Sequence, residues 1–288
     1  MQVLDQVTET DVAVLSSEFD RMVASHHRKF SWDELYERSH DDFWDALAHG
    51  GWLDVRAGST GLSTTLALAE VWGRYLLPLP FLPSLVGDGD AAAVSAAGRT
   101  RPTFALRSAA GSWLVPFGDH PAARVMSRSG EWLDVANRIS GMDRFAPSLP
   151  LAAVSADSMT DAREPDLEVL LPHIVAEALG AACACFDKTV KHAKARIAYG
   201  KPIGSFQAVK HVIADMYMNI EFARSAVTWC ASAADGEGAR LAAGTALDLL
   251  ESVAEASIQV HGGIAYTWEY GMHFYVRHLF ALAKLVGV

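Results

Sequence analysis

The C-terminal half of the chain carries a long helical pattern of apolar residues. From about residue 166 onward, apolar side chains recur every three or four positions, which places them on one face of an α-helix. A helix this long is stable in a globular protein only when other elements cover its apolar face. This requirement constrains the fold more than any other feature of the sequence. On the first predicted helix, these apolar residues form one stripe: Ile174, Ala178, Ala182, Phe186, Val190, Ala193 and Ile197.

Three more helices are predicted after this one. The second follows Gly204 and extends to about Val227, and the third runs from about Arg240 to His261, where two glycines end it. A loop is expected over residues 235–238, and a fourth helix is expected from near Trp268 to the C-terminus. Long helices joined by short connections predict an antiparallel four-helix bundle over residues 166–288.

The N-terminal residues 1–87 also have a helical pattern. Ser31 and Glu34 form an S-x-x-E capping box, and one helix is expected from there to Gly50. Another is expected over residues 62–77, ended by a cluster of prolines.

Residues 88–165 differ from both flanking regions. Short apolar pieces lie between Gly, Ser and Pro residues, which predicts short strands and turns. The expected strands are residues 103–106, 113–116, 124–126 and 131–135. The predicted fold is therefore mainly α with a small β insert: an N-terminal helical domain (1–87), a reduced middle β domain (88–165) and a C-terminal four-helix bundle (166–288).

Composition narrows the classes of partner. Apolar residues make up 51% of the 288 residues, which is ample for a core, and the net charge of −10 disfavours nucleic acid and anionic membranes as partners. No apolar run is expected to reach the roughly 20 residues of a membrane span, and the first residues lack the pattern of a secretory signal. Three cysteines without metal-ligand spacing indicate a reducing cytoplasm.

Two segments of the predicted bundle carry a recognisable pattern. One is Arg196-Ile-Ala-Tyr-Gly-Lys-Pro-Ile-Gly-Ser-Phe-Gln207, and the other is Gln259-Val-His-Gly-Gly263, followed by Ile-Ala-Tyr-Thr-Trp-Glu-Tyr270. They resemble the R-x-x-F-G-x-P-I-G-x-F-Q and Q-x-x-G-G-x-G-[FY]-[ST]-x-E-Y signatures of the acyl-CoA dehydrogenase family. With Trp268 and the His-x-Tyr-x-Arg run, the second segment is similar to the branch that degrades steroids and other bulky acyl-CoA compounds in actinobacteria.

The residue chemistry agrees with this resemblance. The Arg196 guanidinium can form a paired hydrogen bond with a phosphate, and a glycine-containing turn leaves backbone amides free at the next helix start. In the family, the matching residues bind the adenine, ribose and pyrophosphate end of an FAD that the neighbouring subunit mainly holds. The resemblance implies a cofactor-binding half-site formed by Arg196, Ala198, Tyr199, Ile203, Phe206, Gln207, Gln259, Gly262 and Gly263. Taken alone, the glycines are also explained by a helix–helix turn and a helix C-cap.

The catalytic base of the family is missing. Dehydrogenation removes a proton α to the thioester, and a positioned carboxylate must accept it. Counted from the two motifs, the family's two base positions fall on Val286 and near Leu170, and neither side chain accepts a proton. Glu177 lies beside the apolar stripe and is expected to be solvated. Other acids near these positions are Glu168, Glu251, Glu255 and Glu269.

The middle region also lacks the segments that contact the isoalloxazine ring in relatives. The resemblance therefore implies a subunit of a heteromeric, FAD-dependent acyl-CoA dehydrogenase that acts on a bulky, possibly steroid-derived, acyl-CoA. The homologous partner, in a heterodimer or α2β2 heterotetramer, would supply the base and most of the substrate site. Two alternatives remain: a self-sufficient homodimeric dehydrogenase with a relocated base, and a flavin-free scaffold subunit.

Other polar residues have simpler explanations. The eleven histidines show no metal-ligand spacing, so surface or packing roles are expected. His273 and Arg277 share a helix face and could meet a phosphate or an interface carboxylate, although a plain interhelical role is favoured. A basic stretch from Lys188 to Lys210 could attract the phosphates of FAD or coenzyme A, or could be a solvated face. Cys183 and Cys185 are expected in the core.

Overall fold

The computed structural model describes residues 9–55, 61–86, 100–108, 110–232 and 236–287. Its central element is α8 (Leu167–Ala195), which starts where the Asp166 side chain accepts a hydrogen bond from the backbone N–H of Glu168. Every residue from Leu170 to Cys185 is buried. The sequence predicts one apolar stripe here, but this part of α8 is covered on all sides.

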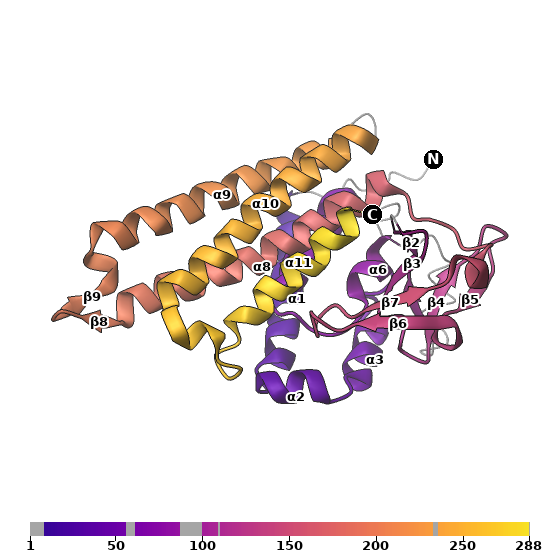
Figure 1. Cartoon of the computed structure of the whole chain (residues 1–288), viewed down its shortest axis with the longest axis horizontal. Coiled ribbons are helices and arrows are strands. Elements are labelled where there is room, and N and C mark those ends of the chain that lie inside the picture. The colour runs from indigo at the N-terminus through magenta and orange to yellow at the C-terminus, as the bar shows by residue number, and fades with distance from the viewer. Residues whose placement is uncertain (1–8, 56–60, 87–99, 109, 233–235, 288) are drawn as a thin grey trace.

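The predicted bundle surrounds α8. Three helices pack against it and lie along it in Figure 1. They are α9 (Gln207–Ser232), α10 (Gly236–His261) and α11 (Met272–Val286). Between α10 and α11, residues Gly262–Tyr266 form the short 3₁₀ helix η4.

Several predicted boundaries in the bundle differ from the structure. The first helix ends at Ala195, and Ile197 lies beyond it and is exposed. The third helix starts at Gly236, so Gly236–Gly238 is helical rather than a loop, while residues 233–235 lie outside the described part. The last helix starts at Met272, four residues after the expected start, because η4 and a turn come first.

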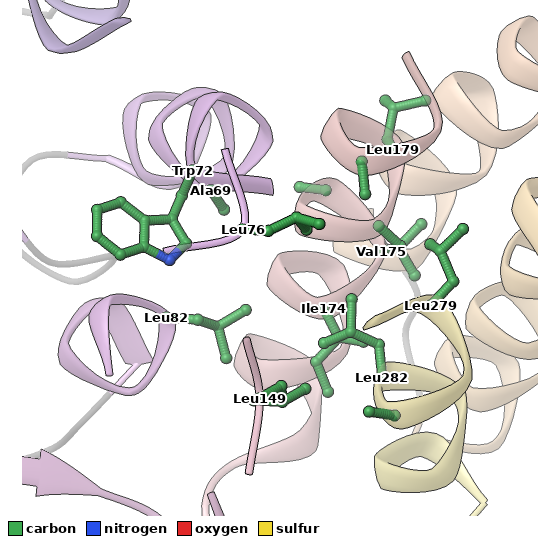
Figure 2. Close-up of a cluster of buried hydrophobic side chains, with 14 of the residues drawn as sticks. Ala69, Trp72, Leu76, Leu82, Leu149, Ile174, Val175, Leu179, Leu279 and Leu282 are labelled. Atoms are coloured by element: carbon green, nitrogen blue, oxygen red, sulfur yellow. The ribbon is translucent and has the colours of Figure 1, made fainter. Parts of the chain in front are cut away.

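The remaining side of α8 is covered by the N-terminal helices. These are α1 (Glu9–His27), α2 (Trp32–Glu37), α3 (Asp41–His49), α5 (Leu62–Gly73) and α6 (Phe81–Val86). Both α5 and α6 pack directly on α8. Figure 2 shows side chains of α5, α6, α8 and α11, together with Leu149, gathered in one apolar cluster.

The capping box of Ser31 and Glu34 is confirmed at the start of α2. The single helix predicted from there to Gly50 is wrong, because the backbone of Arg38 is extended and separates α2 from α3. His40 is buried at this break, with its Nε2 2.7 Å from the Leu35 carbonyl oxygen. The helix predicted over residues 62–77 ends earlier, at Gly73, and Leu76 adopts a left-handed conformation (φ 53°).

The middle region forms two small sheets at one end of the bundle (Figure 1). In the first, β4 (Ala123–Met126) lies between β1 (Arg101–Thr103), to which it is parallel, and β5 (Trp132–Asp134). The second has the order β2-β3-β7-β6 and is antiparallel. Its strands are β2 (Leu106–Arg107), β3 (Trp113–Pro116), β6 (Ile139–Asp143) and β7 (Leu151–Val154).

The predicted strand at 103–106 is divided between β1 and β2, and β6 and β7 were not predicted. The predicted boundary at residues 87–88 lies outside the described residues.

One helix has the composition of a membrane span. By length and hydropathy α8 could cross a bilayer, but 83% of its most apolar window is buried inside the fold. The helix still contains no uninterrupted apolar run of about 20 residues, because Glu168 and Glu177 lie within it.

Candidate functional site

The Arg196 motif forms a hairpin at one end of the bundle. After α8, the short strands β8 (Ile197–Ala198) and β9 (Lys201–Pro202) pair with each other. Tyr199 (φ 52°) and Gly200 (φ 77°) make the turn, and the left-handed conformation at position 200 favours glycine. Tyr199 is 96% exposed at the tip. The hairpin leaves the guanidinium of Arg196 at the surface, with no carboxylate within ion-pairing distance among the described residues.

The hairpin is tied to the start of α9. The backbone N–H of Ile203 donates to the carbonyl of Arg196 over 2.8 Å. The rings of Tyr199 and Phe206 meet edge to face at 6.3 Å, and the ammonium of Lys201 lies 4.5 Å from the Phe206 ring centroid. The short 3₁₀ helix η3 (Ile203–Ser205) leads into α9, of which Gln207 is the first residue and is exposed. Ala198, in β8, is half-buried.

The second motif lies at the end of α10. Gln259 is exposed, and Gly262 (φ 69°) begins η4 in the left-handed conformation that favours glycine. A β-carbon built on Gly262 or Gly263 would meet nothing within 4 Å. Within this chain, packing therefore does not require a glycine at either position, and space is open for another molecule to approach the backbone.

Two histidines bring the motifs together. The rings of His192, in the last turn of α8, and His261, directly before Gly262, lie 4.4 Å apart. Nδ1 of His261 is 2.7 Å from the Ser257 carbonyl oxygen. Burial is the main cause that lowers the pKa of both imidazoles, so both are neutral near pH 7. This contact fixes the end of α8 against the end of α10, so both predicted motifs lie at the same end of the bundle (Figure 1).

A cavity of about 650 Å³ opens beside Gln259. The sequence analysis names Glu255, Gln259, Trp268, His273 and Arg277 one by one, but it does not place them around one cavity. Ile258 could have been found, since it lies on the same helix face as Glu255, three residues earlier. Phe145 could not, because it comes from the loop after β6. The lining residues are Phe145, Glu255, Ile258, Gln259, Tyr266, Trp268, His273, Val276 and Arg277.

The two positions at which the sequence analysis expects the family's base lie in the apolar core. Leu170 is 0% exposed and Val286 is 9% exposed, and both belong to the main hydrophobic cluster. Glu168, Glu255 and Glu269 are exposed, and Glu251 is half-buried with its pKa raised by burial and by the neighbouring Asp248 and Glu255.

The prediction that Glu177 is solvated is wrong. It is 4% exposed rather than solvated, and its Oε1 lies 3.0 Å from Nε2 of the buried His278. The reason is that this part of α8 is covered on all sides, and α11, which packs on α8, brings His278 to Glu177. His278 also meets the hydroxyl of Ser148, 2.9 Å from its Nδ1. The Glu177 side chain is thus held in the interior of the fold.

Lys188 was predicted as part of a basic surface stretch, but it is half-buried. Its ammonium lies 5.1 Å from the Trp32 ring centroid and 4.8 Å from that of Tyr275, and burial lowers its pKa. Cys183 and Cys185 are buried and free, as predicted. Among the described residues, no group of three or more His, Cys, Asp or Glu side chains could hold a metal ion.

Comparisons with known proteins agree with this architecture. Residues 166–286 match the family model "Acyl-CoA dehydrogenase, C-terminal domain". The acyl-CoA dehydrogenase IpdE2 of Mycolicibacterium smegmatis is 32% identical over 78% of this chain and 75% of its own length. IpdE2 of Mycobacterium tuberculosis is 33% identical over 78% and 74%.

Solved structures share the fold. The ChsE4–ChsE5 complex of Mycobacterium tuberculosis superposes with a TM-score of 0.70 at 20% identity, over 99% of this chain and 95% of that one. A variant of the Tcur3481–Tcur3483 steroid ACAD gives a TM-score of 0.71 at 22% identity, over 96% and 94%. With both motifs at one end of the bundle and a relative matched over most of both chains, this protein belongs to the acyl-CoA dehydrogenase family.

Proposed function

We propose that this chain is the FAD-completing subunit of a heteromeric acyl-CoA dehydrogenase. The observation that carries the proposal is the apolar burial of Leu170 and Val286, which leaves neither family base position able to accept a proton. A homologous partner, in a heterodimer or an α2β2 heterotetramer, would supply the carboxylate. The similar structures named after two-component assemblies support this arrangement.

The exposed end of the bundle fits the nucleotide end of FAD. Arg196, which has no carboxylate partner among the described residues, offers its guanidinium to a phosphate. Gln207 and Gln259 offer amide donors and acceptors. Gly262 and Gly263 leave room for close approach to the backbone. Ala198, Tyr199, Ile203 and Phe206 would line the same half-site.

Bound FAD would accept the hydride from the β carbon of the acyl-CoA. The residues of this chain would hold and orient its nucleotide end and exclude water from it. Exposed apolar side chains here, including Ile197, Ile264 and Tyr266, are the kind of surface that a partner chain covers. The fold shared with a steroid ACAD supports a bulky acyl-CoA as the substrate, and the buried free thiols favour a reducing cytoplasm.

Arg196→Gln tests the half-site. In the complex co-purified with the partner, the variant should bind FAD about tenfold or more weakly, because a charge-assisted hydrogen bond to phosphate is lost. The flavin-to-protein ratio and flavin fluorescence on dilution measure this. Lys194→Gln, two residues earlier and also exposed, should leave FAD binding unchanged.

Unchanged flavin content in the Arg196→Gln complex would favour the flavin-free scaffold. Yellow protein that dehydrogenates acyl-CoA without any partner would favour the self-sufficient homodimer. Either result would contradict the proposed function.

Gly263→Ala provides an independent test. A β-carbon there meets no atom of this chain within 4 Å, so the free energy of unfolding should change by less than about 0.5 kcal/mol. If FAD lies against this backbone, its affinity should fall by about five- to thirtyfold. The matched control is Gly244→Ala, on α10 and equally open, which should not affect FAD. Equal FAD affinity in both variants would exclude close approach at Gly263.

A further inference from the structure

Basic residues are concentrated in one segment of this acidic chain. Between Asp187 and Asp215 the sequence contains six lysines and arginines and no aspartate or glutamate, although acidic residues outnumber basic ones by 34 to 24 over the whole chain. Lys188 is half-buried against two aromatic rings, and the other five cations are exposed. The five are Lys191, Lys194, Arg196, Lys201 and Lys210. This segment therefore presents a surface of opposite sign to the net charge of −10.

The fold gathers these five side chains at one end of the bundle. Lys191 and Lys194 lie three residues apart in the last two turns of α8, so they share a helix face. The hairpin that carries Lys201 is followed by a close return to α8, since a β-carbon on Gly204 would lie 3.0 Å from a carbonyl oxygen of that helix. Lys210 lies in the first turn of α9. Figure 1 shows β8, β9 and the adjoining ends of α8 and α9 together at one tip of the molecule.

These cations are unpaired in the described part of the chain. No carboxylate lies within ion-pairing distance of any of the five among the described residues. Other exposed cations do have acidic partners, as Lys284 has in Asp143 over 2.8 Å. Like charges that share one surface repel one another, so an acidic partner is favoured at this end of the bundle.

Exposed apolar side chains lie at the same end. Ile197 and Tyr199 of the hairpin are 56% and 96% exposed. Ile264 and Tyr266 of η4, which the contact between His192 and His261 places near the hairpin, are 47% and 71% exposed. Apolar and aromatic groups bordered by charged ones are typical of a protein interface, where the apolar centre is covered and the polar rim stays partly in water. The combination therefore indicates a surface that another protein chain covers.

We propose that the lysines of this segment form a docking rim for the homologous partner chain, whose facing surface carries a surplus of carboxylates. The docking rim consists of Lys191, Lys194, Lys201 and Lys210. The inference rests on the proposed function for the identity of the partner and adds how that partner is recognised. Complementary charges accelerate the encounter and orient the two chains before their apolar groups meet.

The competing occupant of the docking rim is the pyrophosphate of FAD. The proposed function already assigns Arg196 to this group. A single pyrophosphate carries too little negative charge to pair with four further cations, and the exposed apolar groups beside them gain nothing from a phosphate. Both observations favour a protein surface.

The salt dependence of assembly tests the inference in the co-purified complex. Mass photometry of the diluted complex gives the dissociation constant of the two chains, which should rise with ionic strength between about 0.05 and 0.5 M NaCl. Lys191→Glu/Lys194→Glu should raise this constant about tenfold or more at the lower salt concentration, and by less at the higher one because salt screens the repulsion. Lys191→Gln/Lys194→Gln should give an intermediate increase, and it places no carboxylate near the C-terminus of α8.

Arg128→Glu is the matched control. It changes the net charge by the same amount as Lys191→Glu, and Arg128 is exposed in the turn between β4 and β5, at the opposite end of the molecule (Figure 1). Lys191→Glu should raise the dissociation constant about threefold or more at low salt, and Arg128→Glu should leave it unchanged. Equal effects would mean that only the net charge matters, which would overturn the inference.

A dissociation constant that is independent of salt, or unchanged in the lysine variants, would also overturn it. So would weaker FAD binding by Lys191→Glu/Lys194→Glu at protein concentrations that keep both chains together, because the lysines would then hold phosphate. Arg196→Gln separates the two proposals. Loss of flavin in Arg196→Gln, with unchanged assembly in the lysine variants, would remove this inference and leave the proposed function intact. Lysine-dependent assembly with unchanged flavin content in Arg196→Gln would do the reverse.

Discussion

Replacing Gly180 by alanine is expected to destabilise the protein by about 3 kcal/mol or more, the upper end for overpacking a core. Gly180, in α8, packs on α5, and an added β-carbon would overlap the carbonyl group of Glu70. The contact is reciprocal, since a β-carbon on Gly73 of α5 would overlap the carbonyl group of Glu177 on α8. Both obstacles are backbone atoms, so relief requires the two helices to move apart.

The higher helix propensity of alanine acts in the opposite direction and is smaller than the cost of the overlap. Alanine favours a helix over glycine by at most about 1 kcal/mol, which does not offset the overlap. Gly244→Ala isolates this term, because its β-carbon meets nothing within 4 Å, and it should stabilise α10 by roughly 0.5–1 kcal/mol. Urea unfolding of the two variants measures the difference. Equal midpoints would mean that α5 and α8 are not held at this distance in solution.

This helix crossing shows what the sequence could and could not predict. The periodic apolar residues predicted the helices of the bundle, because burying one face is a property of each helix by itself. Nothing in the sequence around Gly180 indicates that this position must be a glycine. The requirement comes from close packing on α5, which is more than 100 residues away in the chain. The two halves of the candidate site were predictable for a similar reason: each motif is local. The cavity beside Gln259 was not predictable, because Phe145 and Arg277 meet only after the middle region docks on α11.

Short elements were the least predictable. The sequence indicated one helix across Arg38 because nothing in its apolar pattern marks the break. The break depends on the buried His40 and the Leu35 carbonyl. Likewise, β6 pairs with β7, which pairs with β3 on its other side, and a weak local pattern does not reveal these pairings between segments.

Replacing His278 by leucine is expected to destabilise the protein by about 3–5 kcal/mol, because it leaves a buried carboxylate without its partner. Glu177, His278 and Ser148 are 4%, 2% and 1% exposed, and they join α8, α11 and the segment before β7. The double variant Glu177→Leu/His278→Leu removes both polar groups. It should lose less stability than the two single variants added together, by between about 0.5 and 3 kcal/mol. Urea unfolding of all four proteins completes the cycle.

An exposed ion pair between the same two parts of the molecule provides the control. Lys284 of α11 meets Asp143 of β6 at 2.8 Å, with their side chains 48% and 40% exposed, so Lys284→Leu should cost less than about 1 kcal/mol. Equal losses in His278→Leu and Lys284→Leu would show that burial adds nothing to the Glu177–His278 contact. A large loss confined to His278→Leu would mean that the buried group of Glu177, His278 and Ser148 contributes far more to stability than the exposed pair. Since Ser148 follows Phe145 by three residues, the same contact would then also fix one wall of the cavity beside Gln259.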